Sequence, residues 1–510
     1  MSTSSIATTR GAPPAAPHSS GRDRAVALAL VLGAQLMIIL DMTVVNVALP
    51  SIARDLHFSP TGLSWVLNAY TLPFGGLLLL GGRAGDILGR RRVFMAGLAL
   101  FTVASLAGGL ATSAGQLLAA RVAQGAGGAL AIPAVLALIT ASFPEGRERT
   151  RALGLFTAVA MGGASLGLVL GGVIVQWASW RWVLFVNVPI GALVLALAPR
   201  FLPETPRQPG RFDLAGALSS TAGMTALVYA FIRAAAAGWQ DRLTLAALAA
   251  ALVLLGLFLL NEARAAQPIT PLRLFADPGR AGSYLARLLL VAGMFGMFFL
   301  LTLFVQDELR FSPLQAGLAF VPMTAALFAV STSASRLLAR FSPKVLMVAG
   351  LVPVISGMAW LSQIAPGTHY VPGVLGPMLL LGAGMGVVFV PLTMASLAGV
   401  EPRDAGAAAS MVNVMQQVGG SLGLAILVNV FTSASHGAAA GGIGAASPAT
   451  RDAIVHGMGA AFGTAAIFDT IAALIILAFV GTWRRRPAVA PASSRPGPAA
   501  APARVSEQAG

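Results

Sequence analysis

The chain has 510 residues, of which 56% are hydrophobic and 10% are charged, whereas a soluble globular protein carries about 25% charged residues. This composition, with a mean hydropathy of +0.81, excludes a soluble globular protein and indicates an all-α polytopic membrane protein. The absence of cysteine excludes disulfides and thiol chemistry.

The net charge of +15 lies mostly in short basic segments beside apolar ones, so it predicts membrane orientation and not nucleic-acid binding. The five histidines are scattered without metal-ligand spacing, so no metal is expected. The sequence has no nucleophile elbow, no HExxH and no phosphate-binding Gly-x-x-x-x-Gly-Lys loop. We therefore expect no enzyme activity and no cofactor, and an ion gradient in place of ATP as the source of energy.

Fourteen apolar segments of membrane-spanning length follow one another along the chain. They cover residues 25–49, 61–82, 93–112, 117–142, 151–176, 182–199, 213–233, 243–262, 281–306, 314–335, 345–365, 372–398, 405–431 and 461–482. The terminal stretches 1–23 and 487–510 are rich in Ser, Pro and Ala and are predicted to be disordered. If the N-terminus is cytoplasmic, 25 of the 33 basic residues fall in inner loops and tails and 6 in outer loops. This bias predicts that both termini are cytoplasmic.

The chain also contains an internal repeat at an offset of 253 residues. Asp55–Pro60 matches Glu308–Pro313, and Gly82–Leu98 matches Ser335–Leu351 in the same register. The repeat predicts two pseudo-symmetric six-helix bundles, residues 24–200 and 281–486, separated by an inserted two-helix linker, residues 201–280. Repeated halves place a transporter's substrate cavity at their interface, so the repeat favours transport over a static role.

Asp41 lies inside the first apolar segment, where an ionised carboxylate is costly and needs a partner. Arg121 lies inside the fourth segment, and Asp41 is the acidic partner available to it in this half. We predict that the two residues pair and couple transport to protons. The alternatives are a structural carboxylate and an arginine bonded to backbone carbonyls. Asp469 and Arg287 are a second buried acid and base, to which the sequence assigns no role.

The loop between the second and third segments combines an acid, spaced glycines and a basic cluster. It can act as a conformational latch, in which the acid bonds to the basic cluster or to a helix end in one conformation only. The alternative is a plain membrane anchor, which explains the arginines but not the acid and the glycines. The predicted latch residues are Gly82, Asp86, Gly89, Arg90 and Arg91.

Two further sets of residues are predicted from spacing and chemistry. Glycines of the fifth segment, three of them on one helix face, allow close helix packing: Gly163, Gly167, Gly171 and Gly172. Polar and adaptable side chains near the middle of the spans are candidates to line a substrate cavity: Asn46, Gln124, Met294, Met297, Phe298, Asn413, Gln416 and Gln417. We expect Asp307 and Glu308 to be solvated at the outer rim.

Five stretches of the sequence resemble motifs of one family. The run from Gly82 to Arg92 resembles the signature loop of the major facilitator superfamily, although Ile87 replaces its first arginine. Leu40–Pro50, Leu117–Ala129 and Trp180–Gly191 resemble motifs of that superfamily and of its fourteen-helix drug:proton antiporters, the EmrB/QacA type. The glycines of the fifth segment are similar to the antiporter motif, with Leu168 in place of its proline.

The resemblance implies a major facilitator fold with fourteen transmembrane helices in a bacterial plasma (inner) membrane. It implies a proton-coupled efflux antiporter for lipophilic or cationic drug-like molecules, with antibiotic resistance as the biological result. The implied partners are a small-molecule substrate, protons and the lipid bilayer, and the protein is expected to be a monomer. A uniporter or importer of a metabolite, and a non-transporting membrane scaffold or sensor, stay open as alternatives.

Overall fold

The computed structural model describes residues 21–143, 146–205, 207, 212–265, 268, 270–401, 405–435 and 447–481. The tails predicted to be disordered lie outside these residues, apart from residues 21–23, which begin the first helix. Every regular element of the described residues is helical. In chain order they are α1 (Gly21–Leu56), α2 (Pro60–Leu88), α3 (Arg90–Gly109), α4 (Ala114–Ser142), α5 (Arg147–Trp177), α6 (Trp182–Phe185), α7 (Asn187–Phe201), α8 (Leu214–Ala237), α9 (Arg242–Arg264), η1 (Leu272–Phe275), α10 (Pro278–Leu303), η2 (Phe304–Glu308), α11 (Pro313–Ala319), α12 (Val321–Thr332), α13 (Ala334–Arg340), α14 (Pro343–Leu361), α15 (Tyr370–Gly373), α16 (Leu375–Ser396), α17 (Ala405–Ala434) and α18 (Pro448–Phe479).

The predicted spans all correspond to helices of the structure. Within the described residues, 13 helical stretches are long and apolar enough to cross a membrane. The remaining predicted span, 151–176, lies in α5, whose segment Leu166–Trp177 is apolar. Some spans are interrupted: the sixth consists of α6 and α7, and the tenth of α11, α12 and α13. The prediction of an all-α polytopic membrane protein is confirmed.

Several helices begin with the same local sequence, a serine or aspartate followed by proline. The pairs are Ser59–Pro60, Asp277–Pro278, Ser312–Pro313, Ser342–Pro343 and Ser447–Pro448. In each pair the Ser or Asp side chain accepts a hydrogen bond from a backbone N–H of the first turn. Proline fits the first helical position because its missing N–H has no partner there in any case. These caps fix where the membrane helices start.

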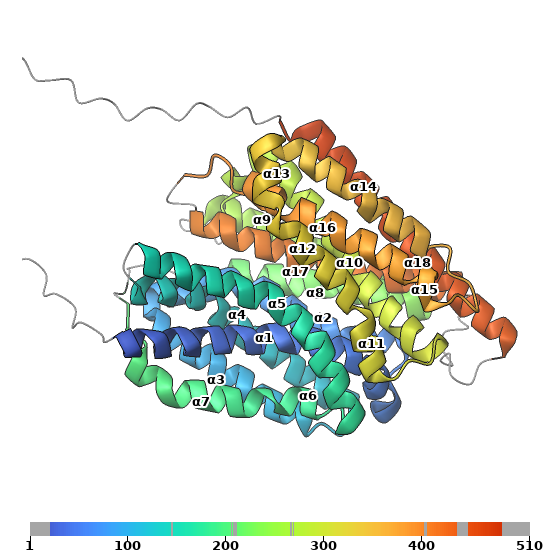
Figure 1. Ribbon diagram of the computed structural model, residues 1–510, viewed down its shortest axis with the longest axis horizontal. Coiled ribbons are helices and arrows are strands. Elements are labelled where there is room, and N and C mark those ends of the chain that lie inside the picture. Colours follow the sequence, from blue (N-terminus) through green and yellow to red (C-terminus); the bar gives the residue numbers. More distant parts are fainter. Residues whose placement is uncertain are drawn as a thin grey trace, which may run out of the picture.

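The helices form two bundles, drawn in blue to green and in yellow to red (Figure 1). In the first, α1 packs on α5 and α7, and α4 packs on α2 and α3; in the second, α10 packs on α17 and α18, and α14 on α16. Both bundles contain one close backbone contact of the same kind. A Cβ on Gly97 would lie 2.6 Å from the Gly127 carbonyl oxygen, and one on Gly350 would lie 2.9 Å from that of Gly384. Gly97 and Gly350 are separated by the 253 residues of the sequence repeat.

The second bundle packs directly on α1 and α5 at one end of the molecule. We call the end where α1 begins the proximal end, and the end where it finishes the distal end. Toward the distal end, Gln306 Nε2 donates to the Val47 carbonyl at 3.0 Å, and Leu314 N donates to Gln176 Oε1 at 3.2 Å. A Cβ on Gly172 would lie 2.6 Å from the Pro313 carbonyl oxygen. These contacts bring the second bundle onto α1 and α5 in their distal halves.

The inserted pair α8–α9 packs along one edge of the interface between the bundles. Its helix α8 contacts both α2 and α17, and Asn429 Nδ2 on α17 donates to the Phe231 carbonyl on α8 at 3.1 Å. Between α8 and α9, Arg233 Nε donates to Asp241 Oδ2 at 3.0 Å, and this bond holds the pKa of the Asp241 carboxyl below its usual value. Thus α8 bridges the first and second bundles on this side.

Candidate functional site

Asp41 of α1 and Arg121 of α4 form an ion pair inside the first bundle. Arg121 Nη1 donates to Asp41 Oδ2 at 2.5 Å, and the exposed fractions of the two side chains are 1% for Arg121 and 0% for Asp41. An ion pair this deep is costly to desolvate and needs further hydrogen bonds to be stable. The groups around the ion pair therefore decide whether it is stable and whether Asp41 can take up a proton.

The second carboxylate oxygen of Asp41 accepts two amide hydrogen bonds. Gln124 Nε2 on α4 and Asn187 Nδ2 on α7 each donate to Asp41 Oδ1 at 2.9 Å. Both amides also donate to Ser105 Oγ on α3, at 2.8 Å from Gln124 and 3.4 Å from Asn187. The carboxylate is thus held by groups from two other helices, α4 and α7, while Ser105 of α3 holds the two amides. Charge-assisted bonds of this kind are stronger than neutral ones.

Arg121 has partners besides Asp41. Its Nε donates to the Val66 carbonyl at 3.1 Å, and its Nη1 lies 3.1 Å from Gln124 Oε1. The guanidinium carbon lies 4.4 Å from the centre of the Tyr70 ring, a cation–π contact. The sequence left two possible partners for Arg121, the Asp41 carboxylate and a backbone carbonyl. In the structure Arg121 bonds to both. If Asp41 became neutral, the guanidinium would keep these other partners.

Glycines on α4 make this arrangement possible. A Cβ on Gly125 would clash with the Tyr70 carbonyl oxygen, and one on Gly128 would lie 3.0 Å from the Phe74 ring. These absent side chains let α2 approach α4 closely, which brings the Val66 carbonyl within reach of Arg121. The polar and small stripe formed by residues 121, 124, 125 and 128 of α4 therefore builds the site.

The predicted latch residues lie together at the proximal end. Asp86 Oδ1 accepts a hydrogen bond from Arg90 Nη2 at 3.0 Å, one turn away. Gly89 joins α2 to α3 with φ of 104°, a conformation that favours glycine. Glu204, just beyond α7, accepts a bond from the Arg91 backbone N–H at 3.2 Å and lies 3.7 Å from the Nε atoms of Arg91 and Arg92. Glu204 is not among the predicted latch residues.

The glycines of α5 face two different neighbours. Gly163, Gly167 and Gly171 face α1, where their nearest neighbours are Leu36, Thr43 and Val44 respectively. Gly172 faces α11 of the second bundle instead. The spacing of four residues thus puts three glycines against α1, and the adjacent glycine brings α5 onto the other half.

The structure does not gather the candidate cavity-lining residues into one site. Gln124 is part of the Asp41 network, and Met297 is fully buried in the core. Asn46 and Asn413 donate to carbonyls of their own helices, and Gln417 packs against Gly75 of α2. Met294 and Phe298 are partly buried against the core, and Gln416 is partly exposed. None of the eight lines the cavities described below, so a role in substrate binding stays a prediction.

Asp469 and Arg287 do not pair in the second bundle. Asp469 is 0% exposed, and neither of its carboxyl oxygens has a hydrogen-bond partner among the described residues. Arg287 Nη2 donates to Thr393 Oγ1 at 2.5 Å, and its guanidinium lies 5.5 Å from the Phe389 ring centre. The buried acid–base network of the first bundle therefore has no equivalent made from these two residues.

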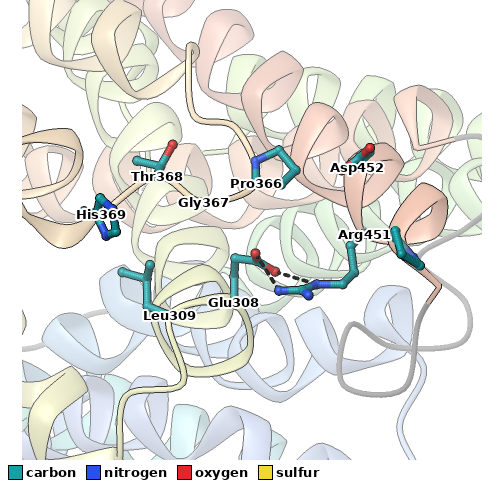
Figure 2. Close-up of a pocket in the computed structure, with 9 residues that line it drawn as sticks. Glu308, Leu309, Pro366, Gly367, Thr368, His369, Arg451 and Asp452 are labelled. Atoms are coloured by element: carbon teal, nitrogen blue, oxygen red, sulfur yellow. Dashed lines mark hydrogen bonds and ion pairs between the residues drawn. The ribbon is translucent and has the colours of Figure 1, made fainter.

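A pocket of about 490 Å³ lies at the distal end of the second bundle (Figure 2). Its lining residues are Glu308, Leu309, Pro366, Gly367, Thr368, His369, Pro448, Arg451 and Asp452. Arg451 Nη2 donates to Glu308 Oε1 at 2.8 Å, and the Glu308 side chain is only 4% exposed. The expectation that Glu308 is solvated was therefore wrong, because Arg451 of α18 packs over it. The same turn, η2, places Gln306 against α1.

Two repeated helical halves, with an acid and a base buried in the first, define a class of multi-pass membrane transporters. The model of the Major Facilitator Superfamily matches residues 31–424, so the chain belongs to that superfamily. It is 44% identical to the cephamycin export protein CmcT of Amycolatopsis lactamdurans over 84% of this chain and 90% of that protein. It is 43% identical to the puromycin resistance protein pur8 of Streptomyces alboniger over 88% of this chain and 89% of that protein. These relatives confirm the predicted family and confirm that the chain is a transporter of small molecules and not an enzyme.

Solved structures agree on the fold. A bacterial homologue of the human lysosomal transporter Spinster, in an inward-facing and occupied conformation, matches 91% of this chain and 98% of its own. The TM-score is 0.67 and the sequence identity is 16%, so this likeness concerns the fold alone.

Proposed function

We infer that the chain is a proton-coupled antiporter that exports antibiotic-like small molecules across a bacterial plasma membrane. The main support is the Asp41–Arg121 pair, a titratable acid held at membrane depth beside a cation. The relatives named for cephamycin export and puromycin resistance support an antibiotic as cargo. The excess of basic residues in alternate loops supports cytoplasmic termini, which makes the proximal end the cytoplasmic one.

The proposed cycle uses a proton on Asp41. When the site is open to the outside, a proton binds Asp41 and weakens its attraction for Arg121. The guanidinium keeps the Val66 carbonyl, Gln124 and the Tyr70 ring, so it is not left without partners. This change favours release of cargo and return to the inward-facing state. Loss of the proton to the cytoplasm restores the ion pair, and cargo binds again.

Coupling of this kind draws its energy from the proton gradient. One elementary charge that crosses about 100 mV is worth about 2.3 kcal/mol. The hydrogen bonds that Gln306 and Leu314 make to the first bundle lie toward the distal end, which agrees with a state closed to the outside. In this state a proton from Asp41 would leave toward the cytoplasm.

The test is transport by the purified chain in proteoliposomes with puromycin as the cargo. We expect uptake into inverted vesicles to need a proton gradient, to stop with a protonophore, and to fall about 100-fold or more in Asp41→Asn, since one acid–base group contributes about 10²–10⁴-fold. Asp55→Asn is the matched control, because Asp55 is an acid at the far end of the same helix and pairs with Arg181. Gradient-independent transport by the wild type would indicate a uniporter, and no transport of any compound in a cargo panel would indicate a scaffold.

A further inference from the structure

A second cavity lies at the proximal end, between the first turns of α1 and α5 and the end of α4, and no residue of the Asp41 network lines it. It is a groove of about 480 Å³. Its apolar lining comes from Ala25, Leu28, Ala29, Leu32, Phe143, Ala152 and Leu155. Three charged residues, Arg24, Glu148 and Arg151, stand at the helix starts and form its rim. The groove is thus apolar along its length and charged at one end only.

The charged rim favours an anion. Arg24 Nη1 pairs with Glu148 Oε2 at 2.7 Å, which neutralises the acid at the rim. Arg151 is exposed and forms no hydrogen bond or ion pair with the described residues. Including the rim, the first turns of α1 and α5 hold the arginines Arg22, Arg24, Arg147, Arg149 and Arg151 against the acids Asp23 and Glu148. The excess positive charge therefore stands directly beside the apolar groove.

The equivalent position in the second bundle is filled by the chain itself. The 253-residue repeat relates α1 to α10 and α5 to α17. Between α10 and α17, Leu274 of η1 and Tyr284 pack against Ala408 and Met411 in one buried cluster. Residues 7–20, which directly precede α1, offer no such filler, since they contain no apolar side chain larger than proline. The groove of the first bundle is therefore suited to a molecule from outside the chain.

We propose that this groove binds one anionic phospholipid. The phosphate lies at Arg24 and Arg151, and one acyl chain follows the apolar lining toward Leu32 and Leu155. The helix rises about 12 Å along α1 from Arg24 to Leu32, enough for the upper part of an acyl chain. Basic pockets between membrane helices on the cytoplasmic side are suited to anionic head groups, and arginine matches phosphate geometry.

The experiment is native mass spectrometry of the purified full chain with either phosphatidylglycerol or phosphatidylcholine. The variant Arg24→Gln/Arg151→Gln removes the two positive charges of the rim, and Ala29→Phe fills the groove without changing charge. The matched controls are Arg336→Gln/Arg340→Gln, two exposed arginines of α13, and Ala196→Phe, an exposed alanine of α7. No transport is measured, so the result does not depend on the proposed antiport.

We expect the wild type and both controls to retain one phosphatidylglycerol in preference to phosphatidylcholine. The arginine variant should bind it on the order of ten-fold more weakly, because each arginine near an anionic head group contributes a several-fold factor. Ala29→Phe should also bind it more weakly, because the ring takes the place of the acyl chain. Equal binding of the two lipids, or groove variants that match the controls, would overturn the proposal. Displacement of the lipid by puromycin would show that the groove binds cargo. Lipid binding only after deletion of residues 2–20 would show that the N-terminal tail occupies the groove. Either result would overturn the proposal.

Discussion

Thr71 of α2 and Ser421 of α17 lie in hydrogen-bond contact across the two halves of the molecule, with 2.5 Å between their hydroxyl oxygens. Both side chains are buried, so the contact belongs to the packed interface between the bundles. A transporter that alternates between two states has to change such contacts. This pair therefore offers a direct test of movement between the halves.

We expect the double variant Thr71→Cys/Ser421→Cys to form a disulfide on oxidation, because the two hydroxyl oxygens are already in contact. The cross-link should stop efflux, and a reductant should restore it. The chain has no other cysteine, so each single variant is a clean control. Undiminished efflux by the fully cross-linked protein would show that this interface does not move during transport.

Asn187 provides a second test, at the Asp41 network. Replacing Asn187 with Leu removes a donor to a buried carboxylate, and a bond to a charged group contributes about 1.5–3 kcal/mol. We expect efflux driven by a proton gradient to fall on the order of ten-fold. Asn429→Leu is the matched control, because Asn429 donates to a neutral carbonyl on α8. This control should lower thermal stability and leave the dependence on the gradient unchanged; the same loss of coupling in both variants would contradict the prediction.

The loop between α2 and α3 predicts a contrast between two glycines. At Gly89 the φ of 104° disfavours other residues by about 1–2 kcal/mol, and a Cβ would lie 2.6 Å from Glu204 Oε1. At Gly82 the nearest atom to a Cβ is 3.7 Å away. Gly89→Ala should therefore lower the melting temperature in detergent and slow efflux, while Gly82→Ala should resemble the wild type. Equal effects of the two changes on melting temperature and efflux would contradict this prediction, because they would show that the backbone conformation at Gly89 does not matter.

The pair at the distal pocket predicts an asymmetry between its members. Arg451→Gln leaves the Glu308 carboxylate buried without its partner, which costs about 3–5 kcal/mol. Glu308→Gln leaves Arg451, whose side chain is 40% exposed, in contact with solvent, and such a loss costs about 0–1 kcal/mol. Thermal unfolding of both variants in one detergent measures the difference. If Glu308→Gln were the more destabilising of the two, the assignment of Glu308 as the buried member would be wrong.

The pairing of Asp41 with Arg121 could be predicted from the sequence because candidates were few. Each is a charged residue inside an apolar span, and a buried charge needs a partner. The apolar spans likewise gave a count of fourteen, against 13 helices of spanning length and the shorter apolar segment of α5 in the described residues. The repeat was visible because the basic loops after the second and tenth spans keep the same order of residues.

The remaining partners could not be predicted, since they come from helices far apart in the sequence. Asn187 and Ser105 are ordinary polar residues of apolar helices, and nothing in their local sequence points toward Asp41. Glu204 lies in a short loop, where an acid is expected to be solvated, and packing brings it to Gly89. Glu308 was misjudged for the same reason, because Arg451, which covers it, lies 143 residues away.

The position of α8 limits how the two halves can rotate. Because α8 contacts α2 on one half and α17 on the other, separation along that edge would strip buried surface from three helices at once. The opposite edge, where α5 meets α11, has no inserted helix beside it in the described residues. We therefore expect the halves to rotate about an axis near α8, with the largest displacement at α5. Fluorophore pairs on the two edges would report unequal distance changes during one transport cycle.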